Sequence, residues 1–152
     1  MEMKNPVQRV AAIHDLSGFG RASLTVVIPI LSTMGVQVCP LPTAVLSTHS
    51  KFPDFHFVNL TADMPKMIAH WRKLGLQFDA IYSGFLGSPQ QVEIVSRFIR
   101  DFSQNQPLVV IDPVLGDDGK LYGPLSRQMV DEMRNLIRDA SIITPNITEA
   151  SL

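Results

Sequence analysis

Short apolar runs of strand length alternate along this chain with longer stretches whose apolar residues recur at helical spacing. This alternation is typical of βαβ units, in which a helix returns the chain so that successive strands lie parallel. It predicts strands at residues 7–14, 36–41, 78–83, 108–111 and 141–144. It predicts helices at residues 22–34, 61–74 and 125–138, and another that begins at Ser88 and includes Phe102. We therefore expect an open, mainly parallel α/β sheet in a single domain, residues 1–152.

The helix that begins at Ser88 has the clearest start signals. Ser88 is a suitable N-cap, Pro89 occupies the first helical position, and Gln91 stands where a capping box is completed. Apolar residues then follow at helical spacing, namely Val92, Val95, Phe98, Ile99 and Phe102. By contrast, residues 42–57 carry Pro53 and several aromatic residues and are predicted to form a long loop, a kind of segment that is usually functional.

Charge and composition exclude several classes of protein. The chain has 13 basic and 14 acidic residues, so its charge gives no indication of binding to nucleic acid or to an anionic membrane. Its hydrophobic content of 45% predicts a packed core, and its apolar tracts are too short for a membrane span or a signal peptide. Cys39 is the only cysteine, which excludes an intrachain disulfide and a cysteine-rich zinc site and favours a cytoplasmic location.

Ligands of open α/β sheets bind at the carboxyl ends of the strands, so the segments after each strand are the candidates for a site. Five segments qualify, at residues 15–21, 42–57, 83–88, 112–119 and 144–149. The first contains Gly18-Phe19-Gly20, which is neither the dinucleotide fingerprint nor a phosphate loop ending in Gly-Lys-Ser/Thr. The four histidines offer no metal-binding pair by their spacing.

Three carboxylates follow the apolar strand at residues 108–111, and they are those of Asp112, Asp117 and Asp118. Magnesium held by one or two carboxylates, water and the phosphates of a nucleotide is the usual arrangement for phosphoryl transfer. The alternative is that Asp118-Gly119 forms an ordinary turn and that Asp112 only ends a strand before proline. The residues alone favour neither interpretation.

The segment at residues 144–149 also has two interpretations. Asn146 and Glu149 have the spacing of a helix capping box, which is the more common role of such a pair. The amino end of a helix beside a carboxylate and an amide is also suited to phosphate and hydrated metal. These two roles are compatible.

Taken together, the motifs at the strand ends resemble those of a known family. The vitamin kinase branch of the ribokinase superfamily, with the pyridoxal kinases as the nearest match, has elements similar to Ser83-Gly84-Phe85-Leu86-Gly87-Ser88, Asp112-Pro113-Val114-Leu115-Gly116-Asp117 and Thr144-Pro145-Asn146-x-x-Glu149. A fourth stretch, Ser47-Thr48-His49-Ser50, resembles the Ser-Asn-His-Thr element that lies beside the pyridine ring of the substrate in that family. The resemblance covers nearly the whole chain, and the motifs occur in the family's order.

The resemblance implies a ribokinase-like, Rossmann-like three-layer α/β/α fold that stops after about five strands. It implies ATP-dependent phosphorylation of the 5′-hydroxymethyl group of pyridoxal, pyridoxamine or pyridoxine. ATP and Mg²⁺ are the implied cofactors, with a monovalent cation such as K⁺ as a further option. The implied partner is a B6 vitamer as small-molecule substrate, without nucleic acid or membrane, and the full-length protein is expected to be a homodimer.

The same resemblance assigns roles to individual residues. The side that binds ATP, phosphate and metal would consist of Asp112, Asp117, Thr144, Asn146 and Glu149. Within it, the metal would be held by Asp112, Asp117 and Glu149, the last commonly through water. The vitamer pocket would be lined by Asp15, Leu46, His49, Ser50 and Phe85.

Two further functions remain open. The first loop, Asp15-Leu16-Ser17-Gly18-Phe19-Gly20, resembles the Asp-Pro-Ser-Gly-Gly-Ala-Gly loop of hydroxymethylpyrimidine kinases, so that substrate is an alternative. A non-catalytic α/β binding or regulatory module is an alternative of another class. The family's Gly-x-Gly-Asp motif, which supplies the anion hole and the general base, does not occur in residues 1–152. The base is therefore expected beyond Leu152, and this polypeptide alone is expected to be inactive.

Overall fold

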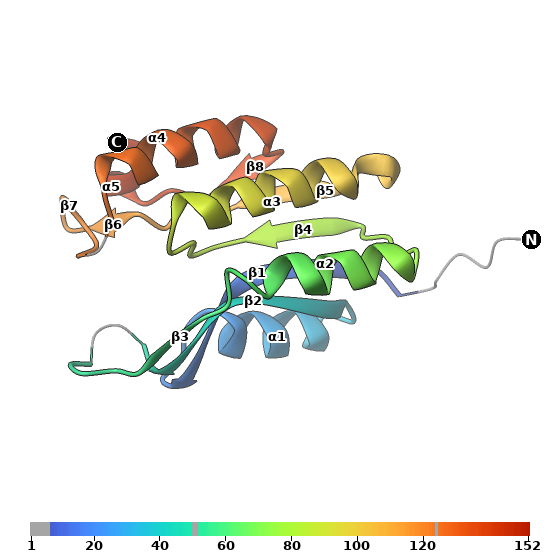
Figure 1. Ribbon diagram of the computed structural model, residues 1–152, viewed down its shortest axis with the longest axis horizontal. Coiled ribbons are helices and arrows are strands. Elements are labelled where there is room, and N and C mark those ends of the chain that lie inside the picture. The colour runs from blue at the N-terminus through green and yellow to red at the C-terminus, as the bar shows by residue number, and fades with distance from the viewer. Residues whose placement is uncertain (1–6, 50–51, 124) are drawn as a thin grey trace, which may run out of the picture.

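A computed structural model of the chain describes residues 7–49, 52–123 and 125–152. Within these residues the chain forms a six-stranded sheet in the order β3-β2-β1-β4-β5-β8 (Figure 1). The strands are β1 (Arg9–Phe19), β2 (Gln37–Thr48), β3 (Phe57–Asn59), β4 (Ala80–Ser83), β5 (Leu108–Ile111) and β8 (Ile142–Ile143). All neighbours pair in parallel except β3, which is antiparallel to β2. The mainly parallel α/β sheet and the ribokinase-like class predicted from the sequence are confirmed.

The helices divide between the two faces of this sheet. They are α1 (Leu24–Thr33), α2 (Met64–Lys73), α3 (Pro89–Asp101) and α4 (Arg127–Leu136), with a one-turn helix α5 (Ile147–Ala150) near Leu152. Helix α1 connects β1 to β2, its neighbour in one direction across the sheet. Helices α2, α3 and α4 lead the chain in the opposite direction, to β4, β5 and β8 in turn. Because such crossovers are right-handed, α1 must lie on the opposite face from the other three. Figure 1 shows this arrangement, with α2, α3 and α4 side by side.

The core lies between the sheet and the face made by α2, α3 and α4. Ile13, Ile81 and Ile111 from adjacent strands are fully buried there. Every apolar residue predicted at helical spacing after Ser88 is buried, with Val95 and Phe98 no more than 1% exposed. The periodicity of the sequence therefore identified the helix face that packs on the sheet.

Two helix starts differ from the prediction in detail. Ser88 does cap α3, since its Oγ accepts a hydrogen bond from the Gln91 backbone N–H at 3.3 Å. The Gln91 side chain, however, accepts from the Gly87 backbone N–H at 2.8 Å, so it does not close the capping box that was predicted. Helix α2 begins after Asp63 and not after Thr61. The Thr61 hydroxyl instead accepts a hydrogen bond from the buried Gln91 amide at 2.9 Å.

The long loop predicted at residues 42–57 is wrong over its first half. Strand β2 continues to Thr48, because β1 also continues to Phe19 and supplies a pairing partner along this length. Gly18 suggested a turn, but its missing side chain serves the pairing, since a Cβ there would lie 3.0 Å from the Ser47 carbonyl oxygen. The register shifts between His14 and Leu16, where the single β1 residue Asp15 faces Thr43 and Ala44, which marks a bulge in β2.

Three further elements differ from the prediction. Residues 116–121 form a hairpin of β6 (Gly116–Asp117) and β7 (Lys120–Leu121) that the sequence analysis did not predict. Helix α4, predicted at residues 125–138, ends at Leu136 and continues as a short 3₁₀ turn, Ile137–Asp139. The predicted strand at residues 141–144 is reduced to the two residues of β8.

Apolar side chains are exposed on the edge strand β8. They are also exposed on the adjacent part of the sheet face that α1 does not cover. β8 is the edge strand after β5, and Ile142 and Ile143 are 48% and 43% exposed. Leu108 on β5 is 47% exposed. Among the described residues, none of the helices combines the length and the hydropathy that a membrane crossing requires.

Candidate functional site

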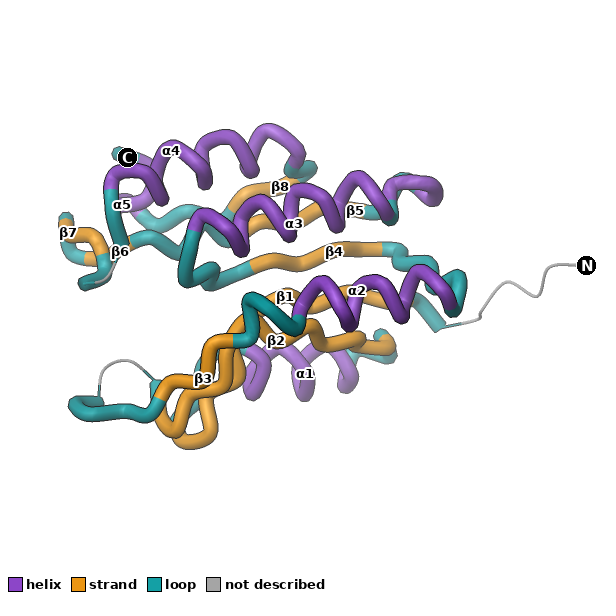
Figure 2. The backbone as a smooth tube through the Cα atoms, viewed as in Figure 1, coloured by secondary structure: helices purple, strands orange, loops and turns teal. Residues whose placement is uncertain are grey.

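The candidate site lies at the carboxyl ends of the parallel strands. The strands β1, β2, β4, β5 and β8 run in the same direction. The segments that follow them therefore meet along the carboxyl-terminal edge of the sheet, which is not the edge formed by strand β8. Figure 2 shows β6, β7, α5 and the region around β3 gathered at this end of the molecule. The structure therefore brings the five predicted segments to a common edge, with a carboxylate side after β5 and β8 and an aromatic side after β1 and β2.

Asp112 is the central acid of the carboxylate side. It follows β5, and its backbone N–H donates to the Ser83 carbonyl at 2.8 Å, which ties it to the end of β4. Its Oδ1 accepts a hydrogen bond from the Thr144 hydroxyl at 3.2 Å. Burial raises the pKa of Asp112, the Thr144 hydrogen bond lowers it, and the charge of Glu149 raises it. Asp112, Thr144 and Glu149 are thus neighbours, as the resemblance implied.

Asn146 and Glu149 form the capping box that their spacing predicts. Asn146 Oδ1 accepts from the Glu149 backbone N–H, and Glu149 Oε2 accepts from the Asn146 backbone N–H, both at 2.9 Å. Each side chain also reaches the segment after β5. Asn146 Nδ2 donates to the Gly116 carbonyl at 2.8 Å, and Glu149 Oε1 accepts from the Leu115 backbone N–H at 3.1 Å. The structural role is therefore present, and it also holds the two acidic segments together.

The β6–β7 hairpin carries Asp117 outward. Asp118 and Gly119 connect its strands with φ of 50° and 75°, the left-handed conformations that a two-residue hairpin turn requires. The turn interpretation of Asp118-Gly119 is confirmed, whereas Asp112 has more contacts than a plain strand end needs. Asp117 is exposed, and its Oδ1 accepts from the Asp118 backbone N–H at 3.0 Å. The Gly119 backbone N–H donates to the Thr148 hydroxyl at 2.9 Å, which fixes the turn against α5.

Tyr122, just after the hairpin, belongs to the same side and was missed by the sequence analysis. Burial raises its pKa, and the charges of Asp117, Glu149, Asp112 and Asp118 raise it further. Four acids act on this one phenol, which shows how much negative charge this edge carries. Such a region is suited to a cation.

The carboxylate side fits a hydrated magnesium ion better than a metal held by protein alone. Within the described residues, no three His, Cys, Asp or Glu side chains lie close enough to form a ready-made metal site. The donors present are carboxylate oxygens, which Mg²⁺ prefers, and Mg²⁺ commonly keeps water and substrate phosphates in its remaining positions. Asp112, with Glu149 beside it, could supply the one or two carboxylates that such an ion needs.

On the aromatic side, the first acid of the predicted vitamer pocket is buried in a small polar cluster. Asp15 is 6% exposed and lies on β1 opposite the bulge of β2. Its two oxygens accept from the Ser23 hydroxyl at 2.5 Å and the Ser17 hydroxyl at 3.1 Å. Leu46, also assigned to the pocket, is 6% exposed. Neither side chain is freely exposed at the edge.

His49 and its neighbours form what we call the aromatic tip, defined as Phe19, His49 and Phe52. The His49 ring packs at 4.8 Å from the Phe52 ring, and Phe19 meets Phe52 edge-on at 5.6 Å. The His49 ring occupies space that only a glycine leaves free, because a Cβ on Gly20 would lie 2.2 Å from it. Phe19 and Phe52 are 64% and 41% exposed, so they are not core residues. Ser50, the remaining predicted pocket residue here, lies outside the described residues.

Phe85, between the two sides, belongs to the segment that joins β4 to α3. The Gly84 backbone N–H donates to the Ile13 carbonyl at 3.0 Å, and the Phe85 carbonyl accepts from the Thr43 hydroxyl at 3.3 Å. A Cβ on Gly84 would lie 2.2 Å from the ring of His14. The motif around Phe85 thus contains a glycine because a histidine ring fills the space above it.

His14 is a second residue that the sequence analysis did not assign. It is 4% exposed and packs edge-on against Tyr82 at 4.4 Å, and its Nε2 has no hydrogen-bond partner among the residues that the structure describes. Burial lowers its pKa to about 4, against the opposing effect of a hydrogen bond with the Tyr82 backbone. Its position at a predicted strand end was the only signal in the sequence.

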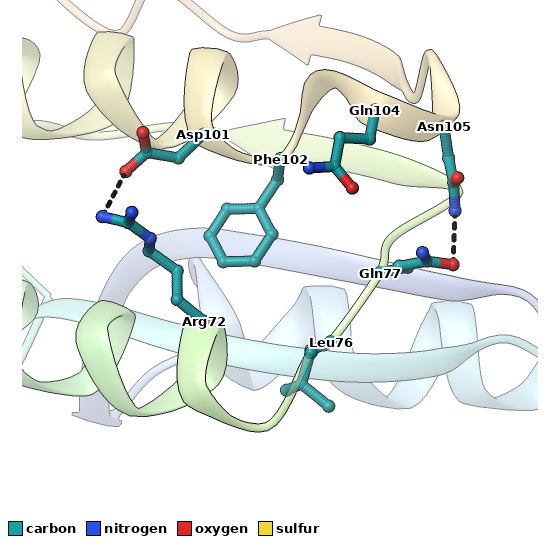
Figure 3. A pocket seen from close by; sticks show the side chains of 8 residues that line it. Arg72, Leu76, Gln77, Asp101, Phe102, Gln104 and Asn105 are labelled. Atoms are coloured by element: carbon teal, nitrogen blue, oxygen red, sulfur yellow. Dashed lines mark hydrogen bonds and ion pairs between the residues drawn. The ribbon is translucent and has the colours of Figure 1, made fainter.

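A cavity is present at the other end of the sheet. It has a volume of about 270 Å³ and lies where α2 and α3 end, before β4 and β5 begin (Figure 3). Arg72 and Asp101 form an ion pair across it at 3.3 Å, and Asn105 donates to Gln77 at 2.8 Å. Its charged groups are paired with one another, and ligands of open α/β sheets bind at the opposite end. We therefore do not assign the site to this cavity.

The fold and this edge define the class of protein: a ribokinase-like α/β protein with an acidic, amide-lined segment beside an aromatic one. Residues 13–152 match the family described as phosphomethylpyrimidine kinase, and the chain belongs to that family. Its relatives make it a pyridoxal kinase-like member, which confirms the resemblance seen in the sequence.

Three relatives illustrate this. The pyridoxine/pyridoxal/pyridoxamine kinase of Bordetella pertussis is 30% identical over 149 residues, covering 90% of this chain and 50% of that protein. A Bacteroides thetaiotaomicron protein classed with the phosphomethylpyrimidine kinases is 62% identical, with a TM-score of 0.95 over 98% of this chain and 52% of the other; a second crystal form of it contains pyridoxal. The pyridoxal kinase of Lactobacillus plantarum is 36% identical, with a TM-score of 0.87 over 97% and 52%. The chain thus spans about half the length of the relatives it matches.

Proposed function

We propose that this chain supplies the vitamer-binding and metal-binding parts of an ATP-dependent kinase that phosphorylates the 5′-hydroxymethyl group of a B6 vitamer. The observation that carries the proposal is the pyridoxal-containing crystal form of the Bacteroides thetaiotaomicron protein, which is 64% identical over 94% of this chain. Similarity at that level, with a TM-score of 0.91, supports a common ligand class.

The geometry supports a division of labour at the edge of the sheet. The aromatic tip and Phe85 would contact the flat pyridine ring, because aromatic side chains offer large apolar surface in fixed orientations. Asp112, with Glu149 and Thr144 around it, would face the phosphates of ATP through Mg²⁺. When bound, Mg²⁺ would neutralise charge that develops on the transferred phosphoryl group. Asp117 and Asn146 would complete this side, and a monovalent cation and a homodimer belong to the same proposal.

Hydroxymethylpyrimidine is the second candidate substrate, since the family model that matches residues 13–152 is named for phosphomethylpyrimidine kinase. Both substrates are flat nitrogen heterocycles with a hydroxymethyl group. The complete gene product should be incubated with MgATP and each compound separately, and ADP release should be measured. We expect a higher kcat/KM for pyridoxal. A higher value for hydroxymethylpyrimidine would transfer the assignment to that substrate, and no ADP release with either would refute the kinase proposal.

We also propose that the 152-residue polypeptide is inactive by itself, because the Gly-x-Gly-Asp motif is absent from it. Positioning and electrostatic stabilisation supply most of the rate in phosphoryl transfer, so the loss of the anion hole and base should abolish turnover. The measurement is pyridoxal 5′-phosphate formation by absorbance, with the pyridoxine/pyridoxal/pyridoxamine kinase of Bordetella pertussis as positive control. Turnover comparable to that control would refute this proposal.

A further inference from the structure

Gln91 is almost completely buried although it carries a polar amide at the start of a helix. It is 1% exposed in the first turn of α3, next to Gln90, which is exposed. Buried amides are tolerated when their hydrogen bonds are made. Gln91 Nε2 donates to the Thr43 carbonyl and to the Thr61 hydroxyl, both at 2.9 Å, and Oε1 accepts from the Gly87 backbone N–H at 2.8 Å.

These partners come from three separate parts of the chain. Thr43 lies within β2 and is fully buried, Thr61 precedes α2, and Gly87 lies between β4 and α3. Figure 1 shows the start of α3 at the carboxyl end of β4, on the same edge as the candidate site. The single amide therefore connects the segment that carries Phe85 to the strand that carries Leu46.

Thr43 extends the connection to Phe85 itself. Its hydroxyl donates to the Phe85 carbonyl at 3.3 Å, while its own carbonyl is one of the Gln91 acceptors. Phe85 is thus held on one side through Thr43 and on the other through Gly87, with the fully buried Leu86 between them. Gln91 therefore holds this backbone directly at Gly87 and indirectly, through Thr43, at Phe85.

We propose that Gln91 is a positioning residue for vitamer binding. It sets the distance between the segment that carries Phe85 and the aromatic side of the site. This inference rests on the proposed function, in which Phe85 contacts the vitamer ring. Gln91 acts through Thr43 and Gly87 and does not itself contact the substrate. Its loss should therefore weaken vitamer binding and leave the ATP side unaffected, because that side is held by contacts among residues 112–149 and by the Asp112–Ser83 backbone hydrogen bond, none of which involves Gln91.

The test uses Gln91→Met in the complete gene product, with Gln90→Met as the matched control. Methionine preserves length and volume but removes all three hydrogen bonds. The Gly87 N–H then loses its partner, and the Thr43 carbonyl keeps only the Leu60 backbone N–H, at 3.2 Å. We expect the KM for pyridoxal to rise about tenfold, with the KM for ATP unchanged. Gln90→Met should leave both unchanged, because that side chain is exposed.

Two further variants keep the test decisive if Gln91→Met does not fold. Thr43→Val removes only the donor to Phe85 and should raise the KM for pyridoxal about threefold. Gln91→Glu keeps the acceptor and, when protonated, regains one donor, so its KM for pyridoxal should fall as the pH is lowered from 8 to 6 while that of wild type follows no such trend.

The outcomes separate the two proposals. A stability loss in the variants with an unchanged KM for pyridoxal would show that Gln91 has only a structural role. A parallel rise in the KM values for pyridoxal and ATP would overturn the inference as well. If the wild-type protein phosphorylates neither pyridoxal nor its congeners, the proposed function fails, and this is seen before any variant is made.

Discussion

The carboxylate side of the candidate site and its aromatic side are held in place by different kinds of contact. Around Asn146 and Glu149, side-chain oxygens and amides bind backbone groups at distances of 2.8 to 3.1 Å. Around His49 and Gly20, the fit depends on ring stacking and on the absence of a side chain. One side is therefore defined by directional hydrogen bonds and the other by shape.

The difference predicts different responses to substitution. Hydrogen bonds to backbone groups are specific to single atoms, so an isosteric change of one oxygen should be enough to disrupt the carboxylate side. The aromatic side should tolerate changes of polarity better than changes of volume. Four predictions test this contrast.

The largest expected effect is that of Asp112→Asn in the complete gene product. The change preserves shape but removes the charge beside the proposed magnesium, so we expect kcat to fall about 1,000-fold. Asp118→Asn is the matched control, because it removes the same charge from an exposed turn in which asparagine also tolerates a positive φ. Steady-state kinetics at saturating Mg²⁺ provide the measurement. Equal activity of the two variants would remove Asp112 from the proposed metal site.

His14 gives the aromatic side a dependence on pH. Its pKa in the folded state is about 4, below the ordinary value of 6.5, so the folded protein disfavours the protonated form. Stability from this group is complete above pH 6.5 and decreases as the pH falls toward 4, by up to about 3 kcal/mol. His14→Gln should lose that part of the pH dependence in urea unfolding measured from pH 7 to pH 4. Parallel curves for the variant and wild type would contradict the assignment.

A smaller effect is expected from added volume in the hairpin of the carboxylate side. A Cβ on Gly116 would lie 2.2 Å from the Lys120 carbonyl oxygen, which is backbone and cannot move aside easily. Gly116→Ala should therefore lower the free energy of unfolding by about 2 kcal/mol. Gly123→Ala is the control, because no atom lies within 4 Å of its added Cβ. Thermal unfolding of both variants would show whether the hairpin is as tightly closed as the structure indicates.

The smallest effect should come from Phe52→Ala at the aromatic tip. Phe52 is 41% exposed and packs against the rings of Phe19 and His49, so its removal should raise the KM for pyridoxal about threefold with little change in stability. Phe57→Ala is a fair comparison, since Phe57 on β3 is exposed to the same extent. A rise of the KM in both variants would indicate a general loss of order in this region and not a specific contact.

How much of the fold could be predicted depended on the range of the interactions. The helix after Ser88 and the buried strand at residues 108–111 were predicted correctly, because helical spacing and short apolar runs are local signals. The continuation of β2 past Leu41, through Pro42, could not be predicted in the same way. It depends on β1 extending alongside it past a bulge, a pairing between residues about 30 positions apart.

The candidate site shows the same division. The capping box of Asn146 and Glu149 follows from their spacing, and the structure contains it. The resemblance to pyridoxal kinases brought Asp112, Thr144 and Glu149 together before their distances were known. No local signal marked Gln91 as a buried connector, and its spacing from Ser88 suggested a different partner. Its actual partners, Thr43 and Thr61, are 48 and 30 residues away.

The exposed isoleucines of β8 should make this polypeptide associate with itself in solution. A short edge strand with two large apolar side chains offers unpaired backbone groups and an exposed apolar surface to any neighbouring molecule. Association through such a surface is driven by the release of water and strengthens on warming and in sulfate. Solutions kept cold, dilute and free of sulfate should therefore stay clear longest, and turbidity on warming would be reversed on cooling while the fold is intact.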